Sequence, residues 1–286
     1  MRRPPEFDAN AYKQGQRRDW DAVAAGWRKW WPVLEAGAGE VTRQLLAMVE
    51  LQPGDRVLDV ATGIGEPALS AAAAVGAGGK VVAVDQSSAM LDIARMRARE
   101  AGLDNIEFIE SDTEQLDLPH YAFDRVLCRW GLMFLPNLVD ALGRMQRLLT
   151  PGGKLAGAVW GAPEAVPSIS LAMDTVARVL DLAPPPRGLP GPFRLADPEE
   201  LEDTLIDAGF VEFHCRSMPV IFEVPSPEAY AEFTRDIAAP ITALLADRPQ
   251  SMQQEVWHRV VTAARDYLSD EGTVRMRNEA ICFVAW

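Results

Sequence analysis

Between residues 56 and 160, short apolar runs alternate with longer segments whose apolar positions recur every three or four residues. The short runs predict buried strands, and the longer periodic segments predict helices with one apolar face. Strands that alternate with helices favour an α/β fold, a doubly wound parallel sheet with helices on both faces. The predicted strands are 56–60, 80–85, 106–111, 123–129 and 154–160.

Local signals fix where the intervening helices begin. Pro67 lacks a backbone N–H and therefore fits the first turn of a helix over 66–75. Ser87 or Ser88 can cap the next helix, because a hydroxyl oxygen accepts from a free N–H of the first turn. A third helix is predicted after Asn137.

The N-terminal part has a different pattern. Over 19–31, three tryptophans and a valine recur at helical spacing, which predicts a helix with an aromatic face. Residues up to about Gln16 are polar and include prolines, which predicts a mobile or clasping arm. A second helix is predicted over 39–50. We therefore interpret 1–50 as an N-terminal helical lid on a domain over 51–286.

After residue 160 the alternation of strands and helices loosens. The segments 161–196 and 225–272 are predicted to be helical insertions that cap one end of the sheet. The run 184–192 is rich in proline, which favours a stiff, extended chain. Further strands are predicted over 211–224 and 274–286. The last of them is a candidate for an exposed edge of the sheet. The sequence leaves open whether the protein forms a homo-oligomer.

Composition narrows the class of protein. The 286-residue chain is 48% hydrophobic, enough to bury a sizeable core. It has neither the roughly 18 uncharged apolar residues of a membrane span nor the apolar run of a secretion signal, so we expect a cytoplasmic protein. Its 28 basic and 41 acidic residues give a net charge of -13, which disfavours nucleic acid as a partner. The three cysteines lie far apart, and no metal site is predicted.

The turn after the first strand points to a ligand. Gly63, Gly65 and Ala68 match the spacing of a dinucleotide-binding turn, in which a helix N-terminus holds a pyrophosphate. Asp59 and Glu66 flank this turn, and a like-charge contact at about 4 Å would cost roughly 4 kcal/mol at an effective dielectric near 20. A ligand that combines adenosine with an ammonium group and a sulfonium is attracted instead. The sequence therefore favours S-adenosylmethionine over NAD.

Four motifs follow one another along the chain, LDVATGIG at 58–65, VD at 84–85, ESDT at 110–113 and LLTPGGKL at 148–155. In these motifs the chain resembles the class I S-adenosylmethionine-dependent methyltransferases, especially the branch related to ubiquinone and menaquinone biosynthesis C-methyltransferases. The resemblance covers about 52–161 and extends more faintly beyond. It implies a mostly parallel seven-stranded sheet of the Rossmann-like methyltransferase type. It also implies S-adenosylmethionine as cofactor and S-adenosylhomocysteine as product.

The resemblance also implies roles for the matched residues. Asp85 ends its strand about 20 residues after the glycine turn, where a carboxylate can accept both ribose hydroxyls. Asp112 would accept from the adenine amino group, and Ile64 and Met90 would hold the two faces of the ring. The glycine turn and residues 128–129 would contact the methionine moiety through their backbone. The implied cofactor-binding residues are Asp59, Ala61, Thr62, Gly63, Ile64, Gly65, Asp85, Gln86, Met90, Asp112, Thr113, Cys128 and Arg129.

Aromatic side chains gather at the predicted carboxyl end of the sheet, where ligands of such folds bind. We therefore expect an apolar or aromatic small molecule as substrate. Alternatively, the tryptophans pack the lid helices against the sheet. The quinone enzymes carry an Arg-Asn pair after Gly-Leu where this chain has Met-Phe, which leaves the identity of the substrate open. The candidate substrate-pocket residues are Trp20, Trp130, Met133, Phe134 and Trp160.

The expected reaction is methyl transfer to carbon or oxygen in biosynthetic or secondary metabolism, catalysed chiefly by positioning the reactants. A general base would assist an oxygen or an activated carbon nucleophile. Two other functions stay open: an S-adenosylmethionine-binding protein that catalyses a non-methylating cyclisation or rearrangement, and an NAD-dependent oxidoreductase. The sequence does not choose among the candidate bases, which are Tyr12, His120, His214, His258 and Glu164.

Overall fold

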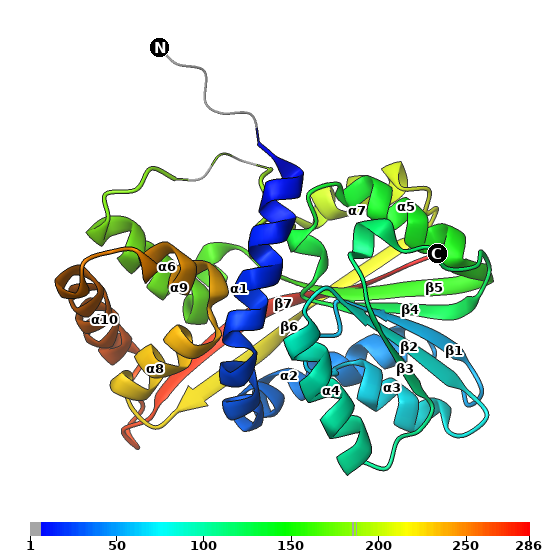
Figure 1. Ribbon diagram of the computed structural model, residues 1–286, viewed down its shortest axis with the longest axis horizontal. Helices are drawn as coiled ribbons and strands as arrows, with labels where there is room; N and C mark the ends of the chain where they lie inside the picture. Colours follow the sequence, from blue (N-terminus) through cyan, green and yellow to red (C-terminus); the bar gives the residue numbers. More distant parts are fainter. Residues whose placement is uncertain (1–6, 185, 187) are drawn as a thin grey trace.

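A seven-stranded sheet runs through the molecule (Figure 1). The computed structural model describes residues 7–184, 186 and 188–286. Its strands are β1 (Arg56–Val60), β2 (Lys80–Asp85), β3 (Ile106–Glu110), β4 (Phe123–Arg129), β5 (Leu149–Trp160), β6 (Phe213–Val224) and β7 (Val274–Ala285). They follow the order β3-β2-β1-β4-β5-β7-β6, in which β1 to β5 are parallel and β7 is antiparallel to both of its neighbours. The predicted doubly wound, mostly parallel sheet is confirmed.

The last strand, β7, lies inside the sheet. It pairs with β5 on one side and with β6 on the other, so Ala285 is opposite both Leu155 and Phe213. The prediction of an exposed final strand is therefore wrong, and β3 and β6 form the edges. Antiparallel partners on both sides satisfy the backbone N–H and carbonyl groups of β7, which allows so apolar a strand to be buried.

Helices flank the strands on either side. Four helices that connect successive strands are α3 (Ala68–Val75), α4 (Ser88–Glu100), α5 (Leu138–Leu148) and α7 (Pro198–Asp207). In Figure 1, α3 and α4 lie below the strands and α5 and α7 above them. The Ser87 hydroxyl accepts from the backbone N–H of Met90 at 3.1 Å and caps α4 as predicted. Pro67 is the N-cap of α3 rather than a member of its first turn, so α3 starts later than predicted.

The N-terminal helix α1 (Ala9–Lys29) crosses the molecule in front of the sheet, between the strands and the cap (Figure 1). It begins well before the predicted start. The Asp8 carboxylate accepts from the backbone N–H groups two and three residues later, each at 3.0 Å, and so caps the helix. The segment expected to be an arm is therefore helical from Ala9 to Gln16. Its residues 1–6 lie outside the described residues.

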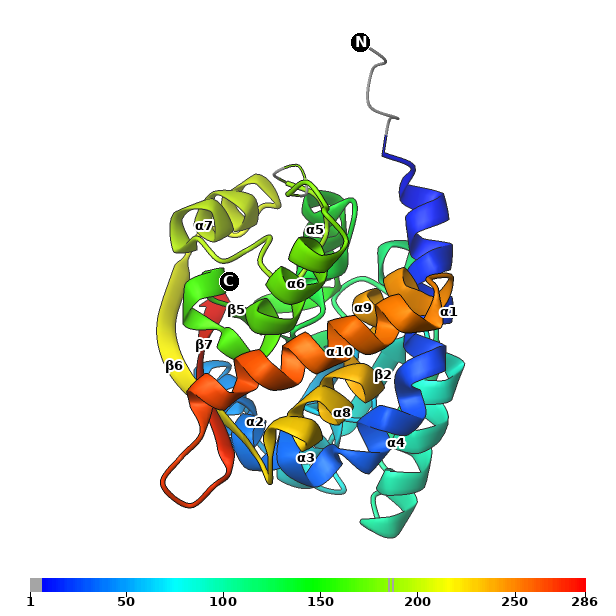
Figure 2. The same ribbon diagram turned by 90° about the vertical axis from the view of Figure 1, so that its left-hand side faces the viewer.

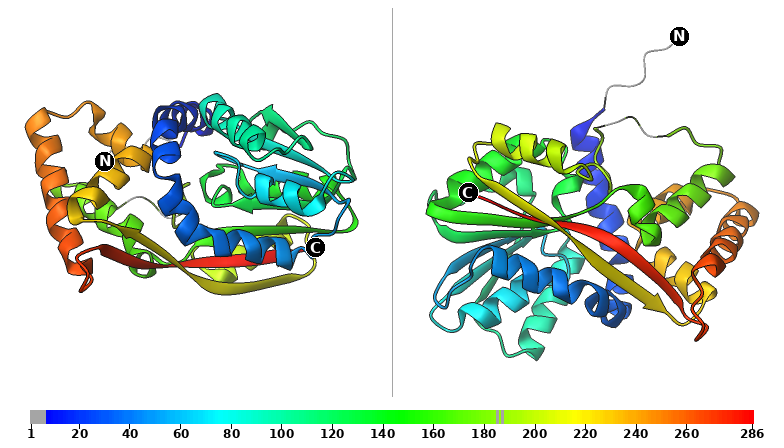
Figure 3. Two further views of the ribbon diagram at one scale, coloured as in Figure 1. Left: turned by 90° about the horizontal axis from the view of Figure 1, so that it is seen from below. Right: turned by 180° about the vertical axis from the view of Figure 1, so that it is seen from behind.

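The second helix, α2 (Trp31–Met48), also starts before the predicted residue 39. Pro32 occupies its first turn, where a missing N–H costs nothing. Gly37 lies inside the helix because α2 approaches the sheet closely there: a Cβ at Gly37 would lie 2.6 Å from the carbonyl oxygen of Ile221. Figure 3 shows α2 lying along β6 and β7.

Four further helices form a cap beside the end of the sheet (Figure 2). They are α6 (Pro167–Val179), α8 (Pro227–Ile237), α9 (Ala239–Ala246) and α10 (Gln250–Ala264). α10 packs against both α6 and α8, which come from the two segments expected as insertions. In the proline-rich run, residues 185 and 187 lie outside the described residues. The division into a lid, a domain and two insertions stays a prediction.

Two glycines of α1 form a matched pair that tests how this helix is held. A Cβ at Gly26 would lie 1.9 Å from the backbone carbonyl oxygen of Asp236 in α8, whereas a Cβ at Gly15 has nothing within 4 Å. We expect Gly26→Ala to lower the free energy of unfolding by about 1–3 kcal/mol. Gly15→Ala should raise it by up to about 1 kcal/mol, because alanine favours the helix. Urea unfolding measures both, and equal effects would contradict the close packing of α1 on α8.

Candidate functional site

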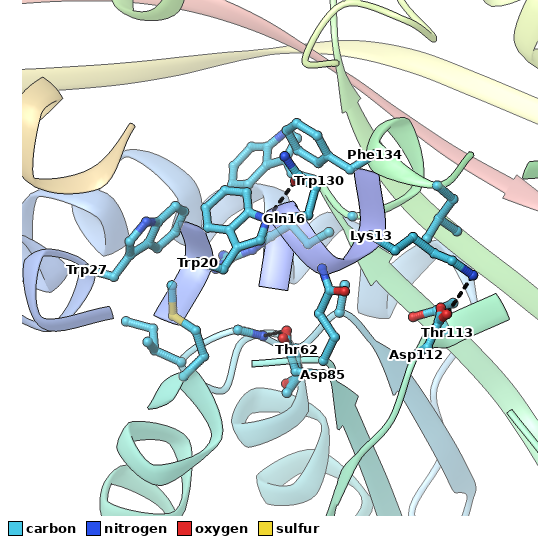
Figure 4. A pocket seen from close by; sticks show the side chains of 18 of the residues that line it. Lys13, Gln16, Trp20, Trp27, Thr62, Asp85, Asp112, Thr113, Trp130 and Phe134 are labelled. Atoms are coloured by element: carbon cyan, nitrogen blue, oxygen red, sulfur yellow. Dashed lines mark hydrogen bonds and ion pairs between the residues drawn. The ribbon is translucent and has the colours of Figure 1, made fainter. Parts of the chain in front are cut away.

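A pocket lies at the carboxyl ends of β1, β2 and β4, beneath α1 (Figure 4). Its cavity volume is about 130 Å³, within about 970 Å³ of empty space that includes open solvent at its mouth. Most of the residues that the sequence assigns to a cofactor meet here. Those that line the pocket are Ala61, Thr62, Gly63, Ile64, Asp85, Gln86, Met90, Asp112, Thr113 and Arg129.

The glycine turn is held by its backbone conformation and by Asp85. Ala61, Gly63 and Gly65 have φ angles of 56°, 56° and 110°, a region that glycine adopts without steric cost. The backbone N–H of Gly63 donates to Oδ2 of Asp85 at 2.8 Å. The turn after β1 is thereby fixed against the end of β2.

Asp85 is the most constrained carboxylate of the lining. Its Oδ1 accepts from the backbone N–H of Ser87 at 2.9 Å, and its side chain is buried. Burial raises the pKa of Asp85 above its ordinary value, against the opposing effect of these backbone N–H groups. Each carboxylate oxygen accepts one of these backbone hydrogen bonds and keeps a second lone pair, so the group can accept further hydrogen bonds from a ligand.

Asp112 lies just beyond β3 and meets a residue of α1. Its Oδ1 accepts from the backbone N–H of Glu114 at 2.9 Å, and its Oδ2 is 2.7 Å from Nζ of Lys13. Lys13 lines the pocket, and sequence reasoning missed it because it lies in the segment expected to be an arm. Its position seven residues before Trp20, about two helical turns, was the available signal.

Three residues expected in the cofactor site, Asp59, Gly65 and Cys128, lie outside the lining. Asp59 is fully buried, and its Oδ2 accepts from the backbone N–H of Ala68 at 3.0 Å, which ties β1 to the start of α3. Burial raises the pKa of Asp59 to about 7. The Cys128 side chain is also fully buried. The side chain of Asp59 therefore holds the start of α3, and that of Cys128 packs in the core.

The end of the pocket near the glycine turn carries charges of both signs. Glu66 lines it, with Oε1 at 3.9 Å from a guanidinium nitrogen of Arg97. Arg129 also lines it and donates from Nη1 to the Thr42 hydroxyl at 2.7 Å. Burial lowers the pKa of Arg129. Two arginines, Arg97 and Arg129, therefore offset part of the negative charge that the sequence predicts near the turn.

Aromatic side chains form the opposite wall, labelled in Figure 4. The ring of Trp20 meets those of Phe134 and Trp27 edge-on, at centroid distances of 5.7 and 5.9 Å. Nε1 of Trp20 donates to the Gln16 side-chain oxygen at 3.0 Å. Trp130 completes the wall. Such edge-to-face pairs create a rigid apolar surface.

Two residues expected in the substrate pocket lie elsewhere. Met133 is fully buried in the core, because the chain makes a short 3-10 turn over Leu132–Phe134 that directs neighbouring side chains to different sides. Trp160 lies behind Trp130, with the two rings stacked at 4.3 Å and an interplanar angle of 11°. Neither residue lines the pocket, and Trp160 supports its wall indirectly.

The candidate bases do not gather at the pocket. His120, His214, His258 and Glu164 are exposed and lie outside the lining. Tyr12 does line it, but burial raises the pKa of its hydroxyl to about 12. Within the described part of the chain, no three His, Cys, Asp or Glu side chains are placed to hold a metal ion. Among the described helices, none has both the length and the apolar character needed to cross a membrane.

Solved structures share this architecture. The YcgJ protein of Bacillus subtilis is similar with a TM-score of 0.59 and 17% identity, over 86% of this chain and 97% of that one. The cyclase SpnF is similar with a TM-score of 0.54 and 21% identity, over 93% and 96% of the two chains. At these identities, the similarity establishes the fold alone.

Sequence comparisons identify the family. A family model described as a methyltransferase domain matches residues 57–153. The ubiquinone/menaquinone biosynthesis C-methyltransferase UbiE of Coxiella burnetii is 34% identical over 46% of this chain, and the chain spans about half of that relative, 50% of its length. UbiE of Ectopseudomonas mendocina is 31% identical over 68% of this chain and 80% of that protein. The chain belongs to the class I S-adenosylmethionine-dependent methyltransferases.

Proposed function

We propose that the protein transfers a methyl group from S-adenosylmethionine to carbon or oxygen of an apolar or aromatic small molecule, in biosynthetic or secondary metabolism. The observation that carries this proposal is the division of one pocket into two parts. Asp85 and Asp112 lie on one side, and an aromatic wall that includes Trp20 and Phe134 lies on the other. A polar nucleoside and an apolar acceptor can thus lie beside each other.

The cofactor side suits a nucleoside. Asp85 can accept from two vicinal hydroxyls, since each of its oxygens keeps a free lone pair. Asp112 can accept from an exocyclic amino group. Ile64 and Met90 both line the pocket and belong to one apolar cluster, which suits the faces of a purine ring. We assign these four residues to the adenosine moiety.

The charged end suits the amino acid part of the cofactor. Glu66 would attract the ammonium group, and Arg129 would attract the carboxylate. A dinucleotide would instead bring its pyrophosphate against Glu66. Together with the family of the chain, this sets aside the NAD-dependent oxidoreductase.

The acceptor side indicates catalysis by positioning. When bound, S-adenosylmethionine supplies a methyl group already activated by a sulfonium. Because the hydroxyl of Tyr12 has a pKa of about 12, it stays protonated at neutral pH and can donate a hydrogen bond to the acceptor. The aromatic wall excludes water and orients the acceptor. Holding reacting atoms about 3–3.5 Å apart can lower a barrier by roughly 7–11 kcal/mol.

The direct test measures S-adenosylhomocysteine after incubation with S-adenosylmethionine and a panel of quinols, phenols and other apolar acceptors. Product that depends on one acceptor class supports methyl transfer and names that class. Tight binding of S-adenosylmethionine with no product from any acceptor would favour the alternative, a non-methylating cyclisation or rearrangement. Failure to bind S-adenosylmethionine would overturn the proposal.

Phe134→Ala tests the aromatic wall. We expect the KM for the acceptor to rise about tenfold or more, because lost apolar contact in a substrate pocket typically costs about 1–3 kcal/mol. The KM for S-adenosylmethionine should change little. Phe213→Ala is the matched control, since Phe213 lies on β6 outside the lining. If Phe134→Ala only lowers the melting temperature, the aromatic side chains pack the lid and do not recognise the acceptor.

A further inference from the structure

The pocket-facing part of α1 carries two parallel rows of side chains. Tyr12, Gln16 and Trp20 are four residues apart and line the pocket. The neighbouring row, Lys13, Arg17 and Asp21, has the same spacing, which places its members on one face of the helix. All three of these side chains contact residues that follow or end β2 and β3.

Lys13 makes the most enclosed contact of the second row. Its Nζ is 2.7 Å from Oδ2 of Asp112 and 3.0 Å from Oε2 of Glu114. The three side chains are only 16%, 23% and 6% exposed, so water screens their attraction weakly. Glu114 is itself fixed, because it accepts from the backbone N–H and the side-chain amide of Asn137 at 2.6 and 2.8 Å. Lys13 therefore binds a rigid pair of carboxylates.

The other two members bind the same side of the molecule. Oδ1 of Asp21 accepts from the Ser87 hydroxyl at 2.6 Å and lies 3.3 Å from the backbone N–H of Ala89. Ser87 in turn donates its backbone N–H to Asp85. Arg17 pairs with Glu110, the last residue of β3. The row thus connects α1 to both segments that carry the nucleoside-binding carboxylates.

We propose that Lys13, Arg17 and Asp21 form a polar latch that closes α1 over the nucleoside and sets how long the cofactor stays bound. This inference rests on the proposed function of the pocket. Lys13 is a positioning residue, since it acts through Asp112. Because Trp20 is on the same helix, opening the latch also removes part of the acceptor wall. Cofactor exchange and acceptor binding therefore exclude each other, and the cofactor binds first.

Lys13→Met tests the latch by the dissociation rate of S-adenosylhomocysteine, followed by stopped-flow tryptophan fluorescence on the full chain. Because charge-assisted hydrogen bonds are stronger than neutral ones, we expect dissociation to be about tenfold faster or more. Lys13→Arg should retain slow dissociation.

Lys29→Met is the matched control. Lys29 is on the same helix and its Nζ also contacts two carboxylates, those of Glu232 and Asp236, each at 2.6 Å, but it does not line the pocket. Lys29→Met should release S-adenosylhomocysteine at the same rate as the wild type. Asp21→Asn provides a second variant and should also accelerate release.

The outcomes separate the latch from the function. Equal dissociation rates in wild type, Lys13→Met and Asp21→Asn would overturn the latch and leave methyl transfer intact. Faster release from Lys29→Met to the same extent would also overturn it, because general loosening of α1 would then explain the effect. A wild type that does not bind S-adenosylhomocysteine would overturn both.

Discussion

Asp85→Asn is expected to weaken the binding of S-adenosylmethionine about 100-fold, measured by calorimetry. The Asp85 carboxylate accepts from two backbone N–H groups, of Gly63 and Ser87. Asparagine has one accepting oxygen, so its NH₂ group must face one of these donors. A buried donor without an acceptor costs about 1–3 kcal/mol. That cost lowers folding stability in the free and bound protein alike, whereas binding weakens through the loss of charged hydrogen bonds to the ribose hydroxyls, about 1.5–3 kcal/mol, of which 2.7 kcal/mol corresponds to about 100-fold.

Asp92→Asn is the control for this substitution. Asp92 is on α4, its side chain is 77% exposed, and it pairs with the nearby Arg95. Its removal should leave binding unchanged, because exposed ion pairs of this kind contribute little. Circular dichroism of Asp85→Asn checks that the fold persists. A folded Asp85→Asn that binds the cofactor as tightly as Asp92→Asn would refute the assignment of Asp85 to the ribose.

The parallel part of the sheet could be predicted because its signals are local. β1, β2 and β4 have the predicted bounds, since each is a short apolar run that turns and glycines separate from its helices. The start of α4 was also predictable, because Ser87 satisfies a free N–H of the first turn within three residues. Such features depend on nearest neighbours along the chain and not on tertiary contacts.

The elements that were not predicted depend on contacts between distant residues. Lys13 lay in a segment expected to be a mobile or clasping arm, but its charge is paired with Asp112 and Glu114, about a hundred residues away. The place of β7 depends on which strands it pairs with, and its sequence is equally compatible with an edge. The position of an antiparallel strand in a sheet is a property of topology rather than of local pattern.

The candidate site shows the same division. Asp85 was expected from its spacing after the glycine turn and Asp112 from the resemblance, and both line the pocket. Met133 was misplaced, since a single residue of a 3-10 turn decides whether a side chain enters the pocket or the core. Asp59 was expected to face the ligand, but β1 directs its side chain to the start of α3.

Asp59 gives the second large expected effect, on stability as a function of pH. Its ordinary pKa of 3.8 rises to about 7 in the folded protein because the carboxyl is fully buried. Between these two values the folded state holds a proton that the unfolded state releases. This contribution to stability is therefore complete below about pH 4, falls by about 1.4 kcal/mol per pH unit as the pH rises, and is lost above about pH 7.

The comparison of wild type with Asp59→Asn isolates this contribution. Burial also raises the pKa of Asp85 and Glu35, so these two groups also lower the stability of the wild type as the pH rises. Asparagine does not titrate, and its amide oxygen can still accept from the backbone N–H of Ala68. Urea unfolding from pH 4.5 to 8 should give a flatter curve for Asp59→Asn, and the difference between the proteins should change by several kcal/mol. Parallel curves would mean that Asp59 is already ionised in the folded state, and a buried charge beside the glycine turn would then have to be balanced by Arg129.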